Sequence, residues 1–164
     1  MSALPALRVA PVDGSLEPAL LALRVHPAQQ AFVGRTVDLL ADAQSRASCE
    51  PMAIILDERP IGLYCIETVA RCIAGRDFDR PALGLRGFLI DANSQGQGLG
   101  TRALAALLAD LATRHPPARL LVLSVDEANH GARRLYQQAG FTDSGERYHG
   151  GRAGAQHLLL RELS

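Results

Sequence analysis

The sequence has no lysine: all 17 of its basic residues are arginines. This absence excludes chemistry that needs a lysine amine, such as a Schiff base or the phosphate contact of a P-loop. The 17 acidic residues balance the arginines, so the chain has no net charge. A neutral chain lacks the overall attraction to nucleic acids and anionic membranes that a basic protein has. We therefore expect neither as a partner.

Cysteines and long apolar stretches are also scarce. The three cysteines, Cys49, Cys65 and Cys72, form no C-x-x-C pair, so the sequence predicts no zinc or other metal site. No apolar stretch approaches the ~18 residues of a membrane span. The N-terminal residues, which Pro5 and Pro11 interrupt, lack the apolar centre of a signal peptide. These absences predict a reduced, cytoplasmic protein.

What the chain does contain is enough apolar sequence for one core. With 164 residues, of which 48% are hydrophobic, we expect a single domain over residues 1–164. The predicted order is a strand at 7–12, interrupted helices between 16 and 47, strands at 53–56, 61–68 and 85–91, a helix at 99–113, a strand at 118–125, a helix at 129–139, and a hairpin with arms near 141–148 and 155–162. A βαβ unit inside an otherwise antiparallel pattern predicts an α+β (mixed α/β) fold.

A glycine-rich segment separates the strand at 85–91 from the most clearly amphipathic helix. It reads DANSQGQGLGT over residues 91–101. Alternating glycines let a backbone approach a ligand closely, and the start of a helix adds the positive end of its dipole. This segment predicts a phosphate or pyrophosphate site. The alternative is a glycine-rich turn that only caps the helix.

Two familiar nucleotide-binding motifs do not fit this segment. A P-loop requires a lysine, which the chain lacks. The dinucleotide fingerprint requires a third glycine where Thr101 stands, and an acidic residue about 20 positions later. That later region is Arg119-Leu120-Leu121. A nucleotide-binding regulatory domain is therefore disfavoured.

Two motifs together resemble those of the GNAT superfamily of N-acetyltransferases. Gln95-x-x-Gly98-x-Gly100 matches the superfamily pattern Q/R-x-x-G-x-G/A. Residues 129–141, NHGARRLYQQAGF, match its second signature, N-x-x-A-x-x-L/F-Y-x-x-x-G-F. The resemblance implies the GNAT fold: a central mixed, mostly antiparallel sheet of about seven strands, splayed in the middle and flanked by about four helices. It also implies acetyl-CoA as cosubstrate, with no metal.

The resemblance assigns cofactor contacts to particular residues. The backbone of Leu89 and Ile90 would bind the pantetheine arm as an added strand, where the sheet splays between strands 85–91 and 118–125. Asn129 would contact the pantetheine or the adenosine. The N–H groups of the glycine-rich segment would hold the pyrophosphate, namely those of Gln95, Gly96, Gln97, Gly98, Leu99, Gly100 and Thr101.

The chemistry needs an acid and a base. An amine that attacks a thioester expels a thiolate, and Tyr136 matches the tyrosine that protonates this leaving group in many members of the superfamily. The alternative is that Tyr136 only packs under the cofactor. The attacking ammonium must first lose a proton, and Glu67, near the end of its strand, is the candidate base. The alternative for Glu67 is a solvated carboxylate at a strand end.

The N-terminal half is similar to that of bacterial spermine/spermidine acetyltransferases, in the stretch LALRVHPAQQAFVGRTVDLL and in the strands after it. This similarity implies a polyamine acceptor and a pocket rich in carboxylates. Four carboxylates on the flanking segments are available, Glu50, Glu67, Asp77 and Asp79. The open alternatives are another small-molecule amine such as an aminoglycoside or amino acid, a protein N-terminus, or a non-catalytic acyl-CoA sensor. The apolar run Leu158 to Leu160 is compatible with a homodimer contact or with the core.

Overall fold

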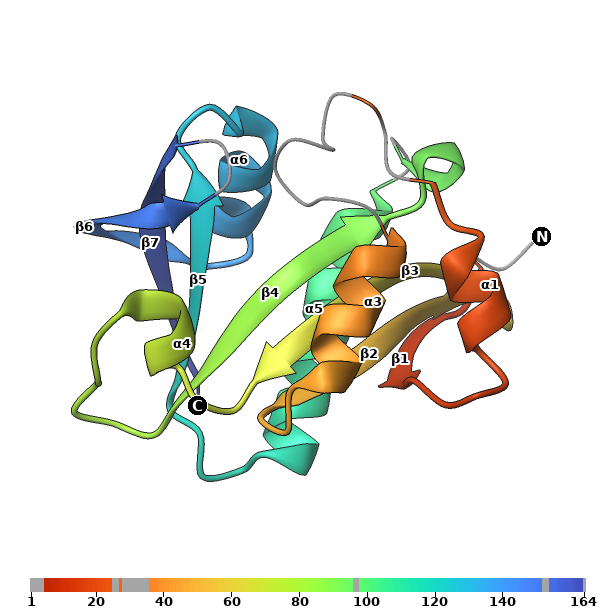
Figure 1. Ribbon diagram of the computed structural model, residues 1–164, viewed down its shortest axis with the longest axis horizontal. Helices are drawn as coiled ribbons and strands as arrows, with labels where there is room; N and C mark the ends of the chain where they lie inside the picture. Colours follow the sequence, from red (N-terminus) through yellow and green to blue (C-terminus); the bar gives the residue numbers. More distant parts are fainter. Residues whose placement is uncertain (1–4, 25–26, 28–35, 96–97, 152–153, 164) are drawn as a thin grey trace.

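A computed structural model describes residues 5–24, 27, 36–95, 98–151 and 154–163. It contains one seven-stranded sheet with the order β1-β2-β3-β4-β5-β7-β6 (Figure 1). Only the β4–β5 pair is parallel, which confirms the predicted mixed, mostly antiparallel sheet. The strands are β1 (Leu7–Pro11), β2 (Cys49–Leu56), β3 (Arg59–Glu67), β4 (Ala82–Ile90), β5 (Leu120–Asp126), β6 (Thr142–Gly151) and β7 (Gly154–Glu162).

Helices cover both faces of the sheet. Figure 1 shows α1, α3 and α4 in front of the sheet and α5 behind it. The described residues form five α-helices and a short 3-10 helix: α1 (Glu17–Leu21), α3 (Thr36–Ser45), α4 (Arg71–Ala74), α5 (Leu99–Arg114), α6 (His130–Gln138) and η2 (Ala92–Ser94). Four helices were expected. The additional one is α4, in a region predicted as a connection.

The turn between β2 and β3 explains how that hairpin forms. Asp57 and Glu58 both have positive φ angles, 48° and 66°. Two consecutive residues of this kind make a two-residue turn whose twist suits antiparallel strands. Leu56 and Arg59 consequently pair directly, and β3 begins two residues before the predicted start.

Each face of the sheet has its own apolar core. Leu104, Leu107 and Leu111 of α5 are at most 1% exposed and pack on one face, as their helical spacing predicts. On the other face, Leu20 of α1 and Leu40 of α3 pack against residues of β2, β3 and β4. Leu159 of β7 is buried in the core under α5, and Leu158 is buried in a separate cluster with Ile73 of α4, so both serve the interior of the chain.

The central strands separate partway along their length. β4 and β5 pair only where residues 82–84 of β4 meet residues 120–122 of β5. Beyond these pairs β4 continues to Ile90 and β5 to Asp126, and Figure 1 shows the two strands diverging. The predicted splay of the sheet is therefore present, and it leaves an opening at the carboxyl ends of two parallel strands.

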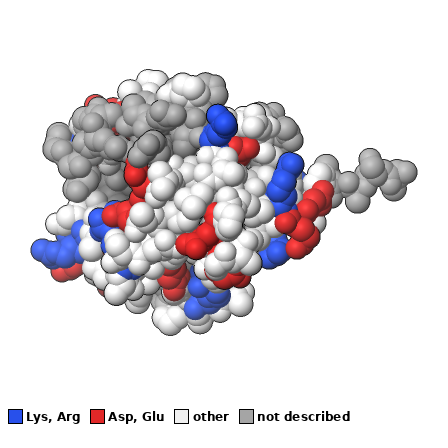
Figure 2. Space-filling view, turned by 45° about the vertical axis from the view of Figure 1, so that its right-hand side comes forward, with Lys and Arg blue, Asp and Glu red and all other residues white. Residues whose placement is uncertain are grey.

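Charged side chains of both signs are intermixed on the face seen in Figure 2. This distribution agrees with the balanced composition of the chain. Among the described residues, no helix has the length and hydrophobicity needed to cross a membrane.

Candidate active site

A pocket of about 350 Å³ lies in the opening between β4 and β5. Its walls come from the end of β4, η2, the start of α5, the end of β5, α6 and β7. The lining residues are Phe88, Leu89, Ile90, Ser94, Gln95, Gly98, Leu99, Gly100, Ser124, Val125, Asp126, Asn129, Gly131, Ala132, Leu135, Tyr136 and Gln156. The two sequence motifs thus meet at one place, although a helix and a strand separate them in the chain.

The pocket reaches both faces of the sheet. Along β5, Leu121, Leu123 and Val125 belong to the core under α5, whereas Val122 packs with α4 on the opposite face. Successive side chains of a strand alternate between faces. Val125 therefore lines the pocket on the α5 side, and Asp126 lines it on the side of α4.

The start of α5 forms the proposed phosphate-binding end. Gly98 is the N-cap of this helix and has a φ of 70°, a left-handed conformation that suits glycine. A Cβ on Gly100 would lie 3.2 Å from a methyl carbon of Leu135, so glycine here lets α5 approach α6 closely. The first N–H groups of a helix have no partner inside the helix and attract anions. Gly96 and Gln97 lie outside the described residues.

Two side chains hold the segment before α5 in place. The Gln95 side-chain amide donates a hydrogen bond of 2.9 Å to the carbonyl oxygen of Ile90. A carboxylate oxygen of Asp91 accepts a 2.8 Å hydrogen bond from the backbone N–H of Arg24. The segment is therefore tied both to the end of β4 and to the chain that follows α1.

The end of β4 presents a backbone edge to the pocket. Leu89 and Ile90 pair with Leu63 and Gly62 of β3 on one side. A Cβ on Gly62 would lie 2.5 Å from the Leu89 carbonyl oxygen, so this close approach requires glycine. The other edge faces the opening, where β5 has already diverged. An extended ligand can therefore add to β4 as a strand would.

Tyr136 lies inside the pocket on α6 and is only 9% exposed. Its ring makes edge contacts with Phe88 and Phe141, at centroid distances of 6.2 and 5.7 Å. Burial raises the pKa of its phenol above the ordinary value. The phenol therefore keeps its proton at neutral pH. Because no described residue hydrogen-bonds the hydroxyl, it can donate to a ligand.

Asn129 both caps α6 and lines the pocket. Its side-chain oxygen accepts a 3.3 Å hydrogen bond from the backbone N–H of Ala132. This is the usual role of asparagine at a helix start. No described residue accepts a hydrogen bond from its side-chain NH₂ group, which can therefore donate to a ligand.

Of the predicted site residues that the structure describes, two do not line the pocket, Thr101 and Glu67. Thr101 is exposed on α5. Glu67 pairs with Gly84, which lies before the point where the sheet opens, and its side chain is fully buried. It is therefore not the solvated carboxylate considered as an alternative.

Glu67 lies in a small polar cluster. Its oxygens accept hydrogen bonds from the Ser48 hydroxyl at 2.9 Å and the Cys49 thiol at 3.3 Å. Burial acts to raise the pKa of Glu67, but hydrogen bonds from Cys72, Cys49 and Ser48 and the charge of Arg86 outweigh it, and the net pKa is lowered. Glu67 is thus a buried carboxylate that stays ionised.

None of the four carboxylates considered for polyamine binding lines the pocket. Glu50 bonds to Arg114 and His115, at 3.3 and 2.9 Å. Asp77 pairs with Arg71, and Asp79 lies near Arg80. Each of these three carboxylates therefore has a cationic partner in this chain and lies outside the pocket lining.

The sequence analysis missed Asp126. This carboxylate lines the pocket, is 5% exposed and belongs to neither of the two motifs. The available signal was strand alternation, because residues 120, 122, 124 and 126 share one face of β5. Its burial inside an opening of the sheet could not be read from that pattern.

Comparisons with known proteins agree with this geometry. The spermine/spermidine N(1)-acetyltransferase of Bacillus subtilis (strain 168) is 30% identical over 145 residues, 88% of this chain and 91% of that protein. The aminoglycoside acetyltransferase AAC(6')-Ib, solved with acetyl-CoA, superposes with a TM-score of 0.76 at 19% identity, covering 96% of this chain and 93% of that one. The spermidine N-acetyltransferase of Vibrio cholerae, solved with CoA and spermine, gives a TM-score of 0.70 at 14% identity, with 95% of each chain covered.

These structural neighbours share the fold and bind CoA or acetyl-CoA. The described residues contain no cluster of side chains suited to a metal ion. Residues 18–141 match the Acetyltransferase (GNAT) family, a range that includes the splayed strands, the start of α5 and Tyr136. The chain therefore belongs to the GNAT family of acetyltransferases.

Proposed function

We propose that this protein transfers the acetyl group of acetyl-CoA to a primary amine of a small cationic molecule. The observation that carries the proposal is the position of the pocket. It opens where the ends of β4 and β5 no longer pair with each other, beside the start of α5, with the Tyr136 phenol inside it. β1, β6 and β7 join the same sheet although they lie outside the family match, which supports a single domain.

The pocket offers each part of the donor a matching group. Backbone N–H groups at the start of α5, from Gly98 onward, would hold the pyrophosphate. The edge of β4 at Ile90, on the side away from β3, would bind the amides of the pantetheine arm, while the neighbouring Leu89 turns its carbonyl oxygen toward β3. The side-chain NH₂ of Asn129 would add a further contact. Acetyl-CoA supplies the activated thioester when it is bound.

Tyr136 is proposed as the general acid. Its buried phenol keeps its proton at neutral pH, and its hydroxyl has no competing partner among the described residues. Attack by the amine forms the C–N bond and breaks the C–S bond, so the sulfur needs a proton. Tyr136 would donate that proton from its hydroxyl.

A polyamine is the proposed acceptor class. The support is the 30% identity to a spermine/spermidine N(1)-acetyltransferase, which extends over both halves of the chain. Glu50, Asp77 and Asp79 pair with cations of this chain and lie outside the pocket lining, so we do not assign them to the acceptor.

The test is release of CoA thiol from acetyl-CoA with a panel of amines: spermidine, spermine, an aminoglycoside, amino acids and short peptides. We expect release with the polyamines. Release with another amine alone would retain the acetyltransferase and reject the polyamine. Acetyl-CoA that raises the melting temperature without any thiol release would favour an acyl-CoA sensor.

A further inference from the structure

Asp126 is a buried carboxylate with one unused oxygen. One oxygen accepts a 2.9 Å hydrogen bond from the backbone N–H of Ala128, which shapes the turn after β5. The other is buried and has no hydrogen-bond partner in the described structure. An unpaired buried polar atom is costly, and more so when it carries charge. Such an atom in a pocket wall indicates that a bound ligand supplies the missing hydrogen-bond or ionic partner.

The described lining of the pocket contains no countercharge for this carboxylate. Asp126 is the only charged side chain among the described residues that line it. Buried charges in proteins are normally paired. CoA cannot supply the missing cation because its charged groups are phosphates. An acceptor that carries an ammonium group can supply it.

The orientation of the Asp126 side chain favours a contact with the acceptor amine rather than with acetyl-CoA. Its side chain lies on the face of β5 that also carries Val122, opposite the core under α5. The start of α5, where the phosphates are proposed to bind, lies on the other face. Gln156 of β7 pairs with Asp126 and also lines the pocket, so it adds a polar group beside the carboxylate.

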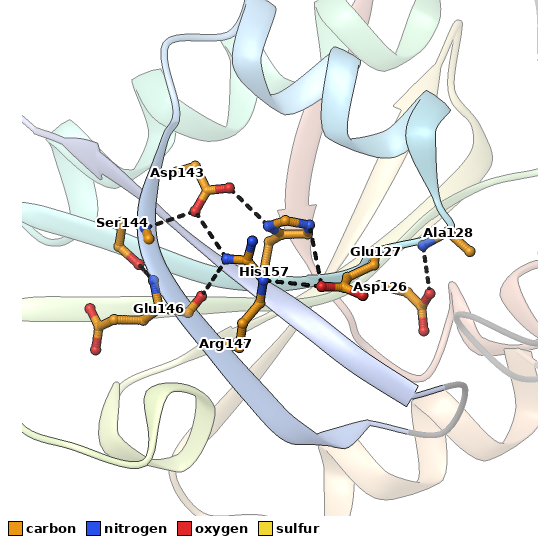
Figure 3. A network of polar contacts seen from close by, with 9 residues as sticks. Asp126, Glu127, Ala128, Asp143, Ser144, Glu146, Arg147 and His157 are labelled. Atoms are coloured by element: carbon orange, nitrogen blue, oxygen red, sulfur yellow. Dashed lines mark hydrogen bonds and ion pairs between the residues drawn. The ribbon is translucent and has the colours of Figure 1, made fainter.

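Glu127, the residue that follows Asp126, provides a comparison. Figure 3 shows the side chains of Asp126 and Glu127 pointing in different directions. Glu127 accepts a 3.0 Å hydrogen bond from Arg147 and lies near His157, outside the pocket lining. Two neighbouring carboxylates thus differ in one respect that matters here: Glu127 has a cation of this chain, and Asp126 has none among the described residues.

We propose that Asp126 binds the ammonium group of the acceptor and thereby selects cationic amines. This inference rests on the proposed acetyltransferase activity. The acceptor would lie on the α4 side of the splayed sheet and reach the acetyl group through the opening, with Asp126 and Gln156 at its charged end.

The experiment measures steady-state kinetics and acetyl-CoA affinity for the wild type, Asp126→Asn and Glu127→Gln, using the best amine from the panel. Asparagine keeps an oxygen for the Ala128 N–H, so the turn is preserved and only the charge is lost. We expect Asp126→Asn to raise the KM for the amine at least about tenfold, the scale of one charge-assisted hydrogen bond. The acetyl-CoA Kd should stay within about twofold, since Asp126 is not assigned to the donor. Glu127→Gln should change neither value.

Any of three other results would contradict the proposed role of Asp126. An unchanged KM for the amine would show that Asp126 does not bind it. A weakened acetyl-CoA affinity would assign Asp126 to the donor. If the wild type turns over no amine, the proposed function fails and this inference falls with it, whereas turnover with an unchanged Asp126→Asn rejects the inference alone. If Asp126→Asn does not fold, Asp126→Ser replaces it, because the serine hydroxyl can accept from the same N–H.

Discussion

The side-chain amide of Gln95 donates to the carbonyl oxygen of Ile90 over 2.9 Å, and so joins the segment before α5 to the last residue of β4. These are the two places where we propose that the pyrophosphate and the pantetheine arm bind. The hydrogen bond fixes their separation before any ligand arrives. A ligand that bridges both therefore spends less free energy on ordering the protein.

Removal of this hydrogen bond should weaken donor binding. For Gln95→Ala we expect the acetyl-CoA Kd to rise between about two- and tenfold, the usual range for one neutral hydrogen bond. Titration calorimetry measures this value directly. Gln137→Ala, on the exposed side of α6, is the control and should leave the Kd unchanged. An unaltered Kd for Gln95→Ala would mean that the segment keeps its position without this contact.

Tyr136→Phe tests the general acid. The phenylalanine ring keeps the contacts with Phe88 and Phe141, so acetyl-CoA affinity should stay nearly constant. We expect kcat to fall by about 10²-fold, the lower end of what a general acid contributes. The control is Tyr64→Phe, which removes a buried hydroxyl without a described partner, outside the pocket lining. If Tyr136→Phe retains full turnover, the tyrosine only packs under the cofactor.

The cofactor half of the site could be predicted from sequence because its groups are local. Gly98 and Gly100 follow one strand and begin one helix. Asn129 caps the start of α6, and Tyr136 lies near the end of that same helix. Spacing along the chain therefore fixes their mutual geometry. The acceptor half depends on contacts between distant segments. Glu67 was the candidate base because it ends a strand, but it pairs with Gly84, before the sheet opens.

The elements of the fold also divide into those that local sequence predicts and those that it does not. The helix at 99–113 follows from its leucine spacing and is present as α5. The helix α4 has only four residues, too few for a periodic pattern to develop, and it ends at Gly75 in a left-handed conformation. Asp126 could be placed on a face of β5 by alternation. Its lack of a countercharge depends on tertiary structure.

Gly98→Val tests the phosphate-binding end of the pocket. Valine is β-branched and strongly disfavours the positive φ of 70°, so the start of α5 should shift and the acetyl-CoA Kd should rise at least about tenfold. Gly75→Val is the matched control, because Gly75 also has a positive φ, 75°, and neither glycine has a neighbour within 4 Å of an added Cβ. Both variants should lose stability, and only Gly98→Val should lose acetyl-CoA affinity. Normal binding by Gly98→Val would place the phosphates elsewhere.

Glu67→Gln separates a structural role for this carboxylate from a catalytic one. The folded-state pKa of Glu67 is lowered below its ordinary value of 4.5, so its ionised form stabilises the native state above that pH. This contribution disappears as the pH falls through the lowered pKa. The wild type should therefore exceed Glu67→Gln in free energy of unfolding at pH 7, and the difference should shrink below about pH 4.5.

Urea unfolding at several pH values measures the difference, with Glu58→Gln as the control, since Glu58 is exposed in its contact with Arg8. The pH profile of kcat/KM is the second readout. Because Glu67 lies outside the pocket lining, we expect the glutamine variant to keep the shape of that profile. Loss of the limb that rises with pH would instead identify Glu67 as the base that deprotonates the amine.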